Sequence, residues 1–198
     1  MNTLKAEKRD MLTKAKKLRR EGYVTGNIYG REMKESIPLQ ITKADAEKIL
    51  RSEGKGSQVM LEVAGETYDA LIKEIDYDSL RGQLLEIDFQ ALVSNEKVHS
   101  VAEIVLVNHD KLEAGVLQQH LEEISFRALP SALVDKIMVD VGDMKVGDVI
   151  KVKDLAIAQD KDVDLKTDLE AAVVSVAAVH VDPALEAEEE AAAEEEAK

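Results

Sequence analysis

The stretch that decides the fold is residues 59–75, which contains Val59-Met60-Leu61-Glu62-Val63, then Ala64-Gly65-Glu66, then Tyr68-Asp69-Ala70-Leu71-Ile72-Lys73-Glu74-Ile75. Two β-prone runs joined by so short a glycine-containing segment predict a β-hairpin. A further run from Leu84 to Leu92 follows the loop around residues 78–82 and predicts another strand. Short consecutive strands are therefore expected to dominate this part of the chain.

The residues before the hairpin predict more short strands and two short helices. Strands are expected at residues 3–10, 27–29 and 36–41, and the middle one lies between Gly26 and Gly30, where a backbone or a ligand comes close. A basic helical turn at residues 14–20 is expected to be capped by Thr13, and a second helix is expected from Thr42, with Asp45 completing its cap, to Gly54. This pattern favours a small, partly closed β-barrel over a parallel sheet, which needs long crossover helices.

The second half of the chain has longer alternating runs, at residues 101–107, 117–129, 137–141, 149–152 and 172–181. No long amphipathic helix separates them, so they predict an antiparallel β-sandwich-like domain. Pro183 closes it, and residues 184–198 are almost wholly Ala and Glu, a composition that cannot bury a core. The fold is therefore expected to be mainly β, with a barrel domain at 1–92, an acidic all-β domain at 97–182, and a disordered or fraying helical tail at 183–198.

Charge is distributed very unevenly along the chain. The formal net charge is -14, but residues 1–92 hold 16 basic and 16 acidic residues, so all the excess acid lies beyond them. Residues 1–20 hold eight basic residues and two acidic ones. A basic segment on an acidic chain is typical of a local contact with a polyanion. The alternative is a solvated charged face, but the contrast with the acidic remainder favours RNA or another polyanion.

Several classes of protein are not supported by the sequence. The chain has no cysteine, so it has no disulfide, thiolate metal site or cysteine nucleophile, which suits the cytoplasm. Its longest apolar run, residues 171–179, is too short to span a membrane, and we expect a protein that is neither secreted nor membrane-bound. No nucleophile, base and orienting group occur at recognisable positions, so we expect no enzyme, no cofactor and no small-molecule substrate.

A metal site is not expected either. The four histidines have no metal-ligand spacing. Asp160, Asp162, Asp164, Asp168 and Glu170 resemble the alternating carboxylates of a calcium loop. The pattern then fails, because Leu165 and Ala171 stand where the turn glycine and the closing glutamate are needed. We therefore interpret this segment as an acidic surface loop.

Ordered motifs along the whole chain resemble one family. Residues 4–9 (Leu-Lys-Ala-Glu-Lys-Arg), 17–22 (Lys-Leu-Arg-Arg-Glu-Gly), 28–30 (Ile-Tyr-Gly) and 86–90 (Glu-Ile-Asp-Phe-Gln) look like successive signatures of the bacterial large-subunit ribosomal proteins numbered twenty-five. Residues 112–116, 137–141, 146–150 and 154–155 resemble the two-domain CTC, or general stress protein, form of that family. The resemblance covers nearly the whole chain apart from the Ala/Glu tail.

The resemblance implies a cytoplasmic, ribosome-associated RNA-binding protein. By similarity, its partners would be 5S rRNA, the large ribosomal subunit and neighbouring ribosomal proteins. The residues that match the family's RNA contacts are Arg9, Lys16, Lys17 and Arg19, with Lys14 and Arg20 as helpers, Tyr29 beside them, and Asp88 as an acceptor for base or sugar donors. Such a set suits folded RNA, which is contacted at phosphates, in the wide minor groove and at irregular loops.

Three departures from the family pattern predict weaker binding of 5S rRNA than in a typical relative. Thr25 stands where the family usually has proline, Glu86 where it has histidine, and Asp76, Tyr77 and Asp78 occupy an upstream loop in place of a Gln-Arg-type contact. Glu86 beside Asp88 would place two carboxylates near phosphates. The alternative function from another class is a stress or interaction adaptor, whose acidic C-terminal domain binds a basic protein partner.

Overall fold

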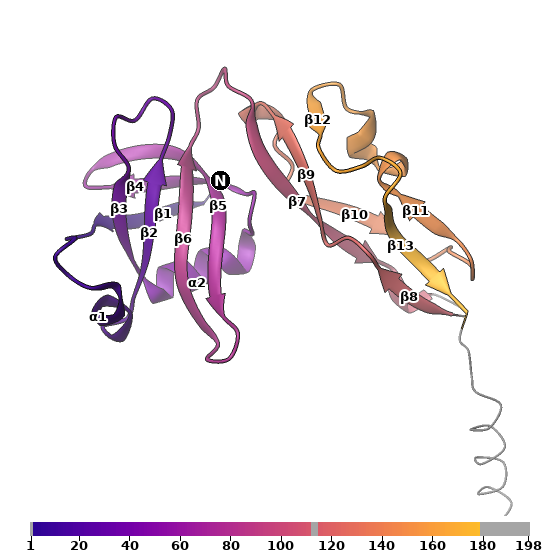
Figure 1. Ribbon diagram of the computed structural model, residues 1–198, viewed down its shortest axis with the longest axis horizontal. Coiled ribbons are helices and arrows are strands. Elements are labelled where there is room, and N and C mark those ends of the chain that lie inside the picture. The colour runs from indigo at the N-terminus through magenta and orange to yellow at the C-terminus, as the bar shows by residue number, and fades with distance from the viewer. Residues whose placement is uncertain (1, 112–114, 179–198) are drawn as a thin grey trace, which may run out of the picture.

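The computed structural model describes residues 2–111 and 115–178. Within them the chain is mainly β, as predicted, with a closed barrel followed by two further sheets (Figure 1). The predicted tail at residues 183–198, His180 and the end of the predicted strand at 172–181 lie outside the described residues.

Six strands form the barrel in the order β1-β3-β2-β6-β5-β4. Their bounds are β1 (Thr3–Lys8), β2 (Tyr23–Tyr29), β3 (Ile37–Thr42), β4 (Gln58–Val63), β5 (Glu66–Asp78) and β6 (Gln83–Ala91). The predicted hairpin is confirmed, because β4 and β5 pair antiparallel with Val63 opposite Glu66. Two pairs, β1 with β4 and β2 with β6, run parallel and close the barrel.

Close backbone approach at Gly26 permits the parallel pairing of β2 with β6. Gly26 lies opposite Ile87, and a Cβ atom at Gly26 would overlap the carbonyl oxygen of Ile87. A residue with a side chain would therefore force the two strands apart. The predicted close approach at this glycine is confirmed, and the partner is backbone.

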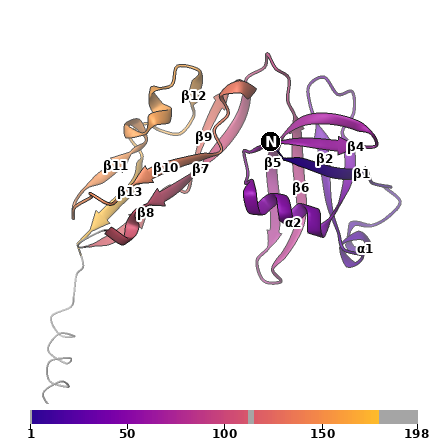
Figure 2. The same cartoon turned by 180° about the vertical axis from the view of Figure 1, so that it is seen from behind.

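Two helices flank the barrel, α1 (Ala15–Arg20) and α2 (Lys43–Ser52). The Thr42 cap of α2 is confirmed: the backbone N–H of Asp45 donates to Oγ1 of Thr42 over 3.2 Å. The predicted Thr13 cap of α1 is wrong, because the helix begins one residue later, with Lys14 in the capping position and no side-chain cap. Buried Leu18 anchors α1 beside β2, while α2 packs against β1, β3 and β2 and lies in front of the barrel strands in Figure 2.

The barrel core contains aliphatic side chains and a single phenylalanine. Phe89 is fully buried among them, and a second phenylalanine, Phe126, is fully buried in the core of the other sheets. These are the only two phenylalanines in the sequence, and the chain has no tryptophan. Each core therefore depends on close packing of valine, isoleucine, leucine and alanine around one ring.

The remaining strands form a four-stranded sheet, β10-β7-β9-β12, and a three-stranded sheet, β11-β13-β8. Their bounds are β7 (Val98–Val107), β8 (Val116–Gln119), β9 (Glu123–Ala128), β10 (Lys136–Asp140), β11 (Val149–Lys151), β12 (Val163–Leu165) and β13 (Ala172–Ala177). Short 3-10 turns lie between them at η1 (His109–Lys111), η2 (Pro130–Ala132), η3 (Val152–Asp154) and η4 (Ala156–Gln159). Residues of both sheets share one buried cluster, which includes Ile124 and Val174.

This part of the chain differs from expectation in three details. The run predicted as one strand at 117–129 is divided into β8 and β9, which belong to different sheets. The pair β7 with β10 runs parallel, although the arrangement was predicted to be antiparallel. The acidic segment contains a short strand, β12, which pairs with β9. One buried cluster lies before residues 92–97 and another lies after them, and the division into two domains at this point stays a prediction.

Replacing Gly26 with alanine tests the closure of the barrel. Because the new methyl group would overlap the Ile87 carbonyl, Gly26→Ala is expected to lower the free energy of unfolding by about 3 kcal/mol, measured by urea denaturation. The matched control is Gly65→Ala, where φ is +88° and no atom lies within 4 Å of the added Cβ. Only the conformational cost of about 1–2 kcal/mol is expected there. An equal loss in both variants would contradict the steric argument.

Candidate nucleic-acid interface

Helix α1 presents most of the predicted contact residues to solvent. Lys14, Lys16 and Arg20 are exposed. Lys17 is 69% exposed and forms an ion pair of 3.7 Å with Glu21 one turn later. Buried Leu18 fixes the opposite side of the helix to the barrel, so the cations point away from the core. The arrangement concentrates positive charge on one short element.

Arg9 and Arg19 are half-buried and connect this helix to the barrel. Nη2 of Arg9 donates to the carbonyl oxygen of Thr13 over 3.1 Å, which holds the loop between β1 and α1. Nε of Arg9 is buried and has no hydrogen-bond partner among the described residues. Nε of Arg19 donates to the carbonyl oxygen of Leu85 on β6 over 3.2 Å. The two guanidinium groups therefore lie where α1 meets the strand face.

The outward side of β2 and β6 carries a polar row next to these arginines. The strand register places Thr25 opposite Glu86, and Asn27 opposite Asp88. The backbone N–H of Asn27 donates to Oδ1 of Asp88 over 3.1 Å, and its side-chain amide donates to Glu86 and Asp88 over 3.3 Å each. Asn27 therefore holds both carboxylates in fixed positions on the face.

Strand β5 adds two more carboxylates to the same face. Glu74 lies opposite Asp88, and Asp76 lies opposite Glu86. The prediction of a loop at residues 76–78 is wrong. These residues form the end of β5, and the strand register is irregular between Asp76 and Tyr77. Their carboxylates are therefore brought against β6 by strand pairing, which a loop would not enforce.

The electrostatics of the face reflect this crowding. Partial burial raises the pKa of Glu86 above its ordinary value, the neighbouring Asp88 raises it further, and Arg19 opposes both effects. Burial, followed by the charges of Asp88 and Glu74, also raises the pKa of the Tyr29 hydroxyl. The ring of Tyr29 stays accessible, with 39% of the residue exposed.

The structure brings Arg9, Arg19, Tyr29 and Asp88 to one face, and Lys14, Lys16, Lys17 and Arg20 to the helix at its end. Cationic side chains beside fixed amide and carboxylate groups and an accessible ring can contact phosphates, base edges and a base plane of a folded RNA. Asn27 and Glu74 also belong to this face, although neither was among the predicted contact residues. The sequence shows that Asn27 and Glu74 alternate with apolar residues along β2 and β5, but it does not show which strands pair with β2 and β5.

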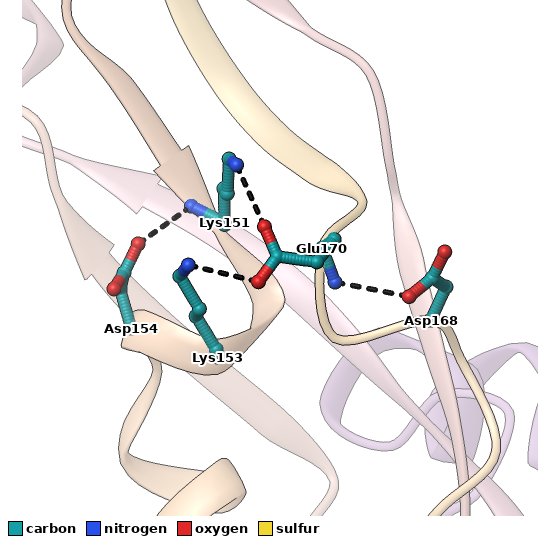
Figure 3. Close-up of polar contacts among 5 residues, drawn as sticks. All are labelled: Lys151, Lys153, Asp154, Asp168 and Glu170. Atoms are coloured by element: carbon teal, nitrogen blue, oxygen red, sulfur yellow. Dashed lines mark hydrogen bonds and ion pairs between the residues drawn. The ribbon is translucent and has the colours of Figure 1, made fainter.

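The acidic segment at residues 160–170 is organised by ion pairs within the protein. Glu170 accepts hydrogen bonds from Nζ of Lys151 over 2.8 Å and from Nζ of Lys153 over 2.9 Å (Figure 3). Asp164 pairs with Lys97 over 2.9 Å, and Asp168 accepts from the backbone N–H of Glu170. Three or more His, Cys, Asp or Glu side chains that could hold a metal ion do not converge anywhere in residues 2–111 and 115–178. Within the same residues, every helix is too short or too polar to cross a membrane.

Comparison with known proteins accounts for both halves of the chain. Residues 4–89 match the model of the ribosomal L25p family, and residues 97–180 match that of the ribosomal protein TL5 C-terminal domain. The chain is 32% identical over 177 residues to the large ribosomal subunit protein bL25 of Caldanaerobacter subterraneus subsp. tengcongensis, covering 88% of each chain. It is 39% identical over 142 residues to the bL25 protein of Geobacillus thermodenitrificans, covering 71% of this chain and 67% of the relative.

Both matching models describe ribosomal proteins, which are structural components and not enzymes. The chain belongs to the ribosomal L25p family, in the two-domain form that carries the TL5-type C-terminal domain. The resemblance found in the sequence motifs is thereby confirmed.

The Glu170 ion-pair cluster gives a prediction about pH. Hydrogen bonds from Lys151 and then Lys153 lower the pKa of Glu170 from 4.5 to about 2. A lowered carboxylate pKa stabilises the fold above the unfolded value of about 4.5, and this stabilisation is lost as the pH falls toward about 2. Glu170→Gln should therefore be less stable than wild type at pH 6, with the difference shrinking through this window. Because the Glu170 side chain is 61% exposed, added salt should also shrink the difference. A difference in urea midpoint between wild type and Glu170→Gln that does not change with pH would contradict this account.

Proposed function

We propose that the chain is a structural component of the large ribosomal subunit, and that its barrel binds 5S rRNA through an RNA-binding face. This face consists of Arg9, helix α1 and the outward residues of β2 and β6. Its proposed contacts are Arg9, Lys14, Lys16, Lys17, Arg19, Arg20, Tyr29 and Asp88. The cytoplasmic location follows from assembly into the ribosome.

The observation that carries the proposal is the position of the cations. Six basic residues of the first twenty lie on or beside a helix that is fixed to the barrel by one buried leucine. Such crowding is unfavourable unless a polyanion neutralises it, and the rest of this acidic chain offers no general attraction for RNA. The names of the relatives, which describe large-subunit ribosomal proteins, point in the same direction.

The side chains of the face divide into two roles. Lys14, Lys16 and Arg20 are suited to phosphates, because they are exposed and flexible and can neutralise the backbone charge wherever it passes. Asp88 and Asn27 are held by hydrogen bonds, so they are suited to fixed donors and acceptors on bases or on the ribose 2′-hydroxyl. Tyr29 supplies an exposed ring for stacking. Affinity would then come from the helix, and orientation from the strands.

Glu86 reduces the affinity in this account. Its carboxylate stands next to Asp88 and near Arg19, so it repels phosphate and offsets part of an arginine's charge. The alternative function, an adaptor that binds a basic protein through the acidic domain, is not favoured, because both halves of the chain match ribosomal protein families. We also propose that residues 97–182 form a second domain.

Removing the helix cations tests the proposal directly. The triple variant Lys14→Ala, Lys16→Ala and Arg20→Ala should bind 5S rRNA at least about tenfold more weakly than wild type in a filter-binding titration. The slope of log affinity against log salt, expected near -3 to -4 for wild type, should become shallower by about 2. The control replaces the exposed Lys48, Lys145 and Lys161, which lie away from α1, and should leave affinity and slope nearly unchanged. Equal losses in the two variants would contradict a local interface.

Replacing Glu86 tests its place at the RNA surface. Glu86→His should bind 5S rRNA more tightly than wild type at matched salt, because a repelling carboxylate next to Asp88 is removed. Glu62→His on β4, outside the RNA-binding face, serves as the control and should bind like wild type. Unchanged affinity in Glu86→His would place Glu86 away from the RNA.

A further inference from the structure

A cleft lies between the barrel and the four-stranded sheet, on residues that the proposed RNA-binding face does not use. Its volume is about 170 Å³. The barrel side is formed by Lys55 and Gly56, which precede β4, and by residues 71–73 of β5. The other side is formed by residues 99–101 of β7, residues 125–126 of β9, and Lys166. Ile72 on the barrel side belongs to the barrel core, and Phe126 on the other side belongs to the core of the further sheets.

The two walls of the cleft meet closely at Gly56. Gly56 has a φ of +87° and packs so closely on β7 that a Cβ atom there would overlap the carbonyl oxygen of Val101. Its own N–H donates to the carbonyl oxygen of Ile72 over 2.8 Å, and its carbonyl oxygen accepts from the buried hydroxyl of Ser100 over 3.3 Å. The two walls are therefore in direct contact at Gly56, through its close approach to Val101 and the hydroxyl of Ser100.

The charged groups that line the cleft all have the same sign. Lys55, Lys73 and Lys166 line it together with His99, whereas no aspartate or glutamate does so in the described part of the chain. This is unusual on a chain with a formal net charge of -14. Apolar Leu71 and Phe126 line the cleft as well, so the ammonium groups lie beside a surface that screens charge poorly.

The lysines are only partly neutralised by the protein. Lys55 forms an ion pair of 2.9 Å with Glu123. Nζ of Lys73 donates to the carbonyl oxygen of His99 over 2.7 Å, and neither Lys73 nor Lys166 forms an ion pair within residues 2–111 and 115–178. Partial burial and then the charge of Lys55 lower the pKa of Lys73. Asp164 is near Lys166, but its hydrogen bond goes to Lys97. Positive charge is thus left over inside the cleft.

We propose that this cleft binds a phosphate group, held by Lys73 and Lys166 from its two walls with Lys55 as a third cation. Lysine is a compact charge that binds phosphate oxygens without demanding a fixed planar geometry, which suits side chains approaching from opposite walls. The same chemistry serves a free phosphate ion and the phosphate of an RNA backbone. The site is separate from the RNA-binding face. A phosphate bound there would also link the barrel to the four-stranded sheet.

The first arm of the test is an NMR titration of the full chain with inorganic phosphate, at constant ionic strength with chloride as the replaced anion. Backbone amide signals of Lys73 and Ser100 should shift along a saturable curve. In the variant Lys73→Gln with Lys166→Gln, the dissociation constant should rise at least about tenfold. The control variant, Lys48→Gln with Lys161→Gln, removes one exposed lysine on each side of the cleft and should bind phosphate like wild type.

The second arm replaces phosphate with a short oligouridine, which presents backbone phosphates without a particular fold. A saturable shift of the same amides that is weakened only in the cleft variant supports an RNA source, and a response to inorganic phosphate alone supports a free ion. The proposal is overturned if neither probe gives a saturable shift, or if the cleft and control variants respond alike. Thermal unfolding verifies that the variants are folded, and the single variant Lys166→Gln carries the test if Lys73→Gln unfolds. Because the first arm contains no RNA, failure of the 5S rRNA proposal would leave its result intact.

Discussion

The parallel pairing of β2 with β6 is the contact on which the barrel and its candidate interface both depend. These strands are distant in sequence, and at Gly26 they approach so closely that a Cβ atom would overlap the Ile87 carbonyl. The pairing closes the barrel around Phe89. It also places Asn27 beside Asp88 and brings the Leu85 carbonyl within reach of Arg19. One steric condition therefore serves the core on one side of the strands and the polar face on the other.

Local charge, and not the charge of the whole chain, governs the proposed function. The excess of acid lies beyond residue 92, where pairs such as Glu170 with Lys151 and Lys153 neutralise part of it. Lys16, Lys17 and Arg20 of α1 are exposed, and Lys17 forms an ion pair with Glu21, the residue that follows the helix. Screening by salt over about 10 Å keeps the distant acidic residues from cancelling the field of the helix. An acidic protein can in this way retain a surface that attracts RNA.

The sequence predicted those features that depend on neighbouring residues. The hairpin of β4 and β5, the Thr42 cap and the basic helix all follow from local patterns, and the structure has them. Pairings between distant strands could not be predicted, because the alternation of polar and apolar residues shows which side chains of a strand share a face but not which strand lies next to that strand. For this reason Asn27 and Glu74 were missed, and Asp76 was assigned to a loop. Strand β12 was not predicted either, since a strand of three residues with one buried valine gives almost no periodic signal in the sequence.

The most direct test of the central claim is protection of lysine side chains from acetylation when 5S rRNA is added to the full chain, with each site quantified by mass spectrometry. The account predicts that Lys14, Lys16 and Lys17 are strongly protected, while Lys48, Lys145 and Lys161 react as in the free protein. If the RNA is bound and the lysines of α1 react at their free rate, the cationic helix is not the surface that holds it.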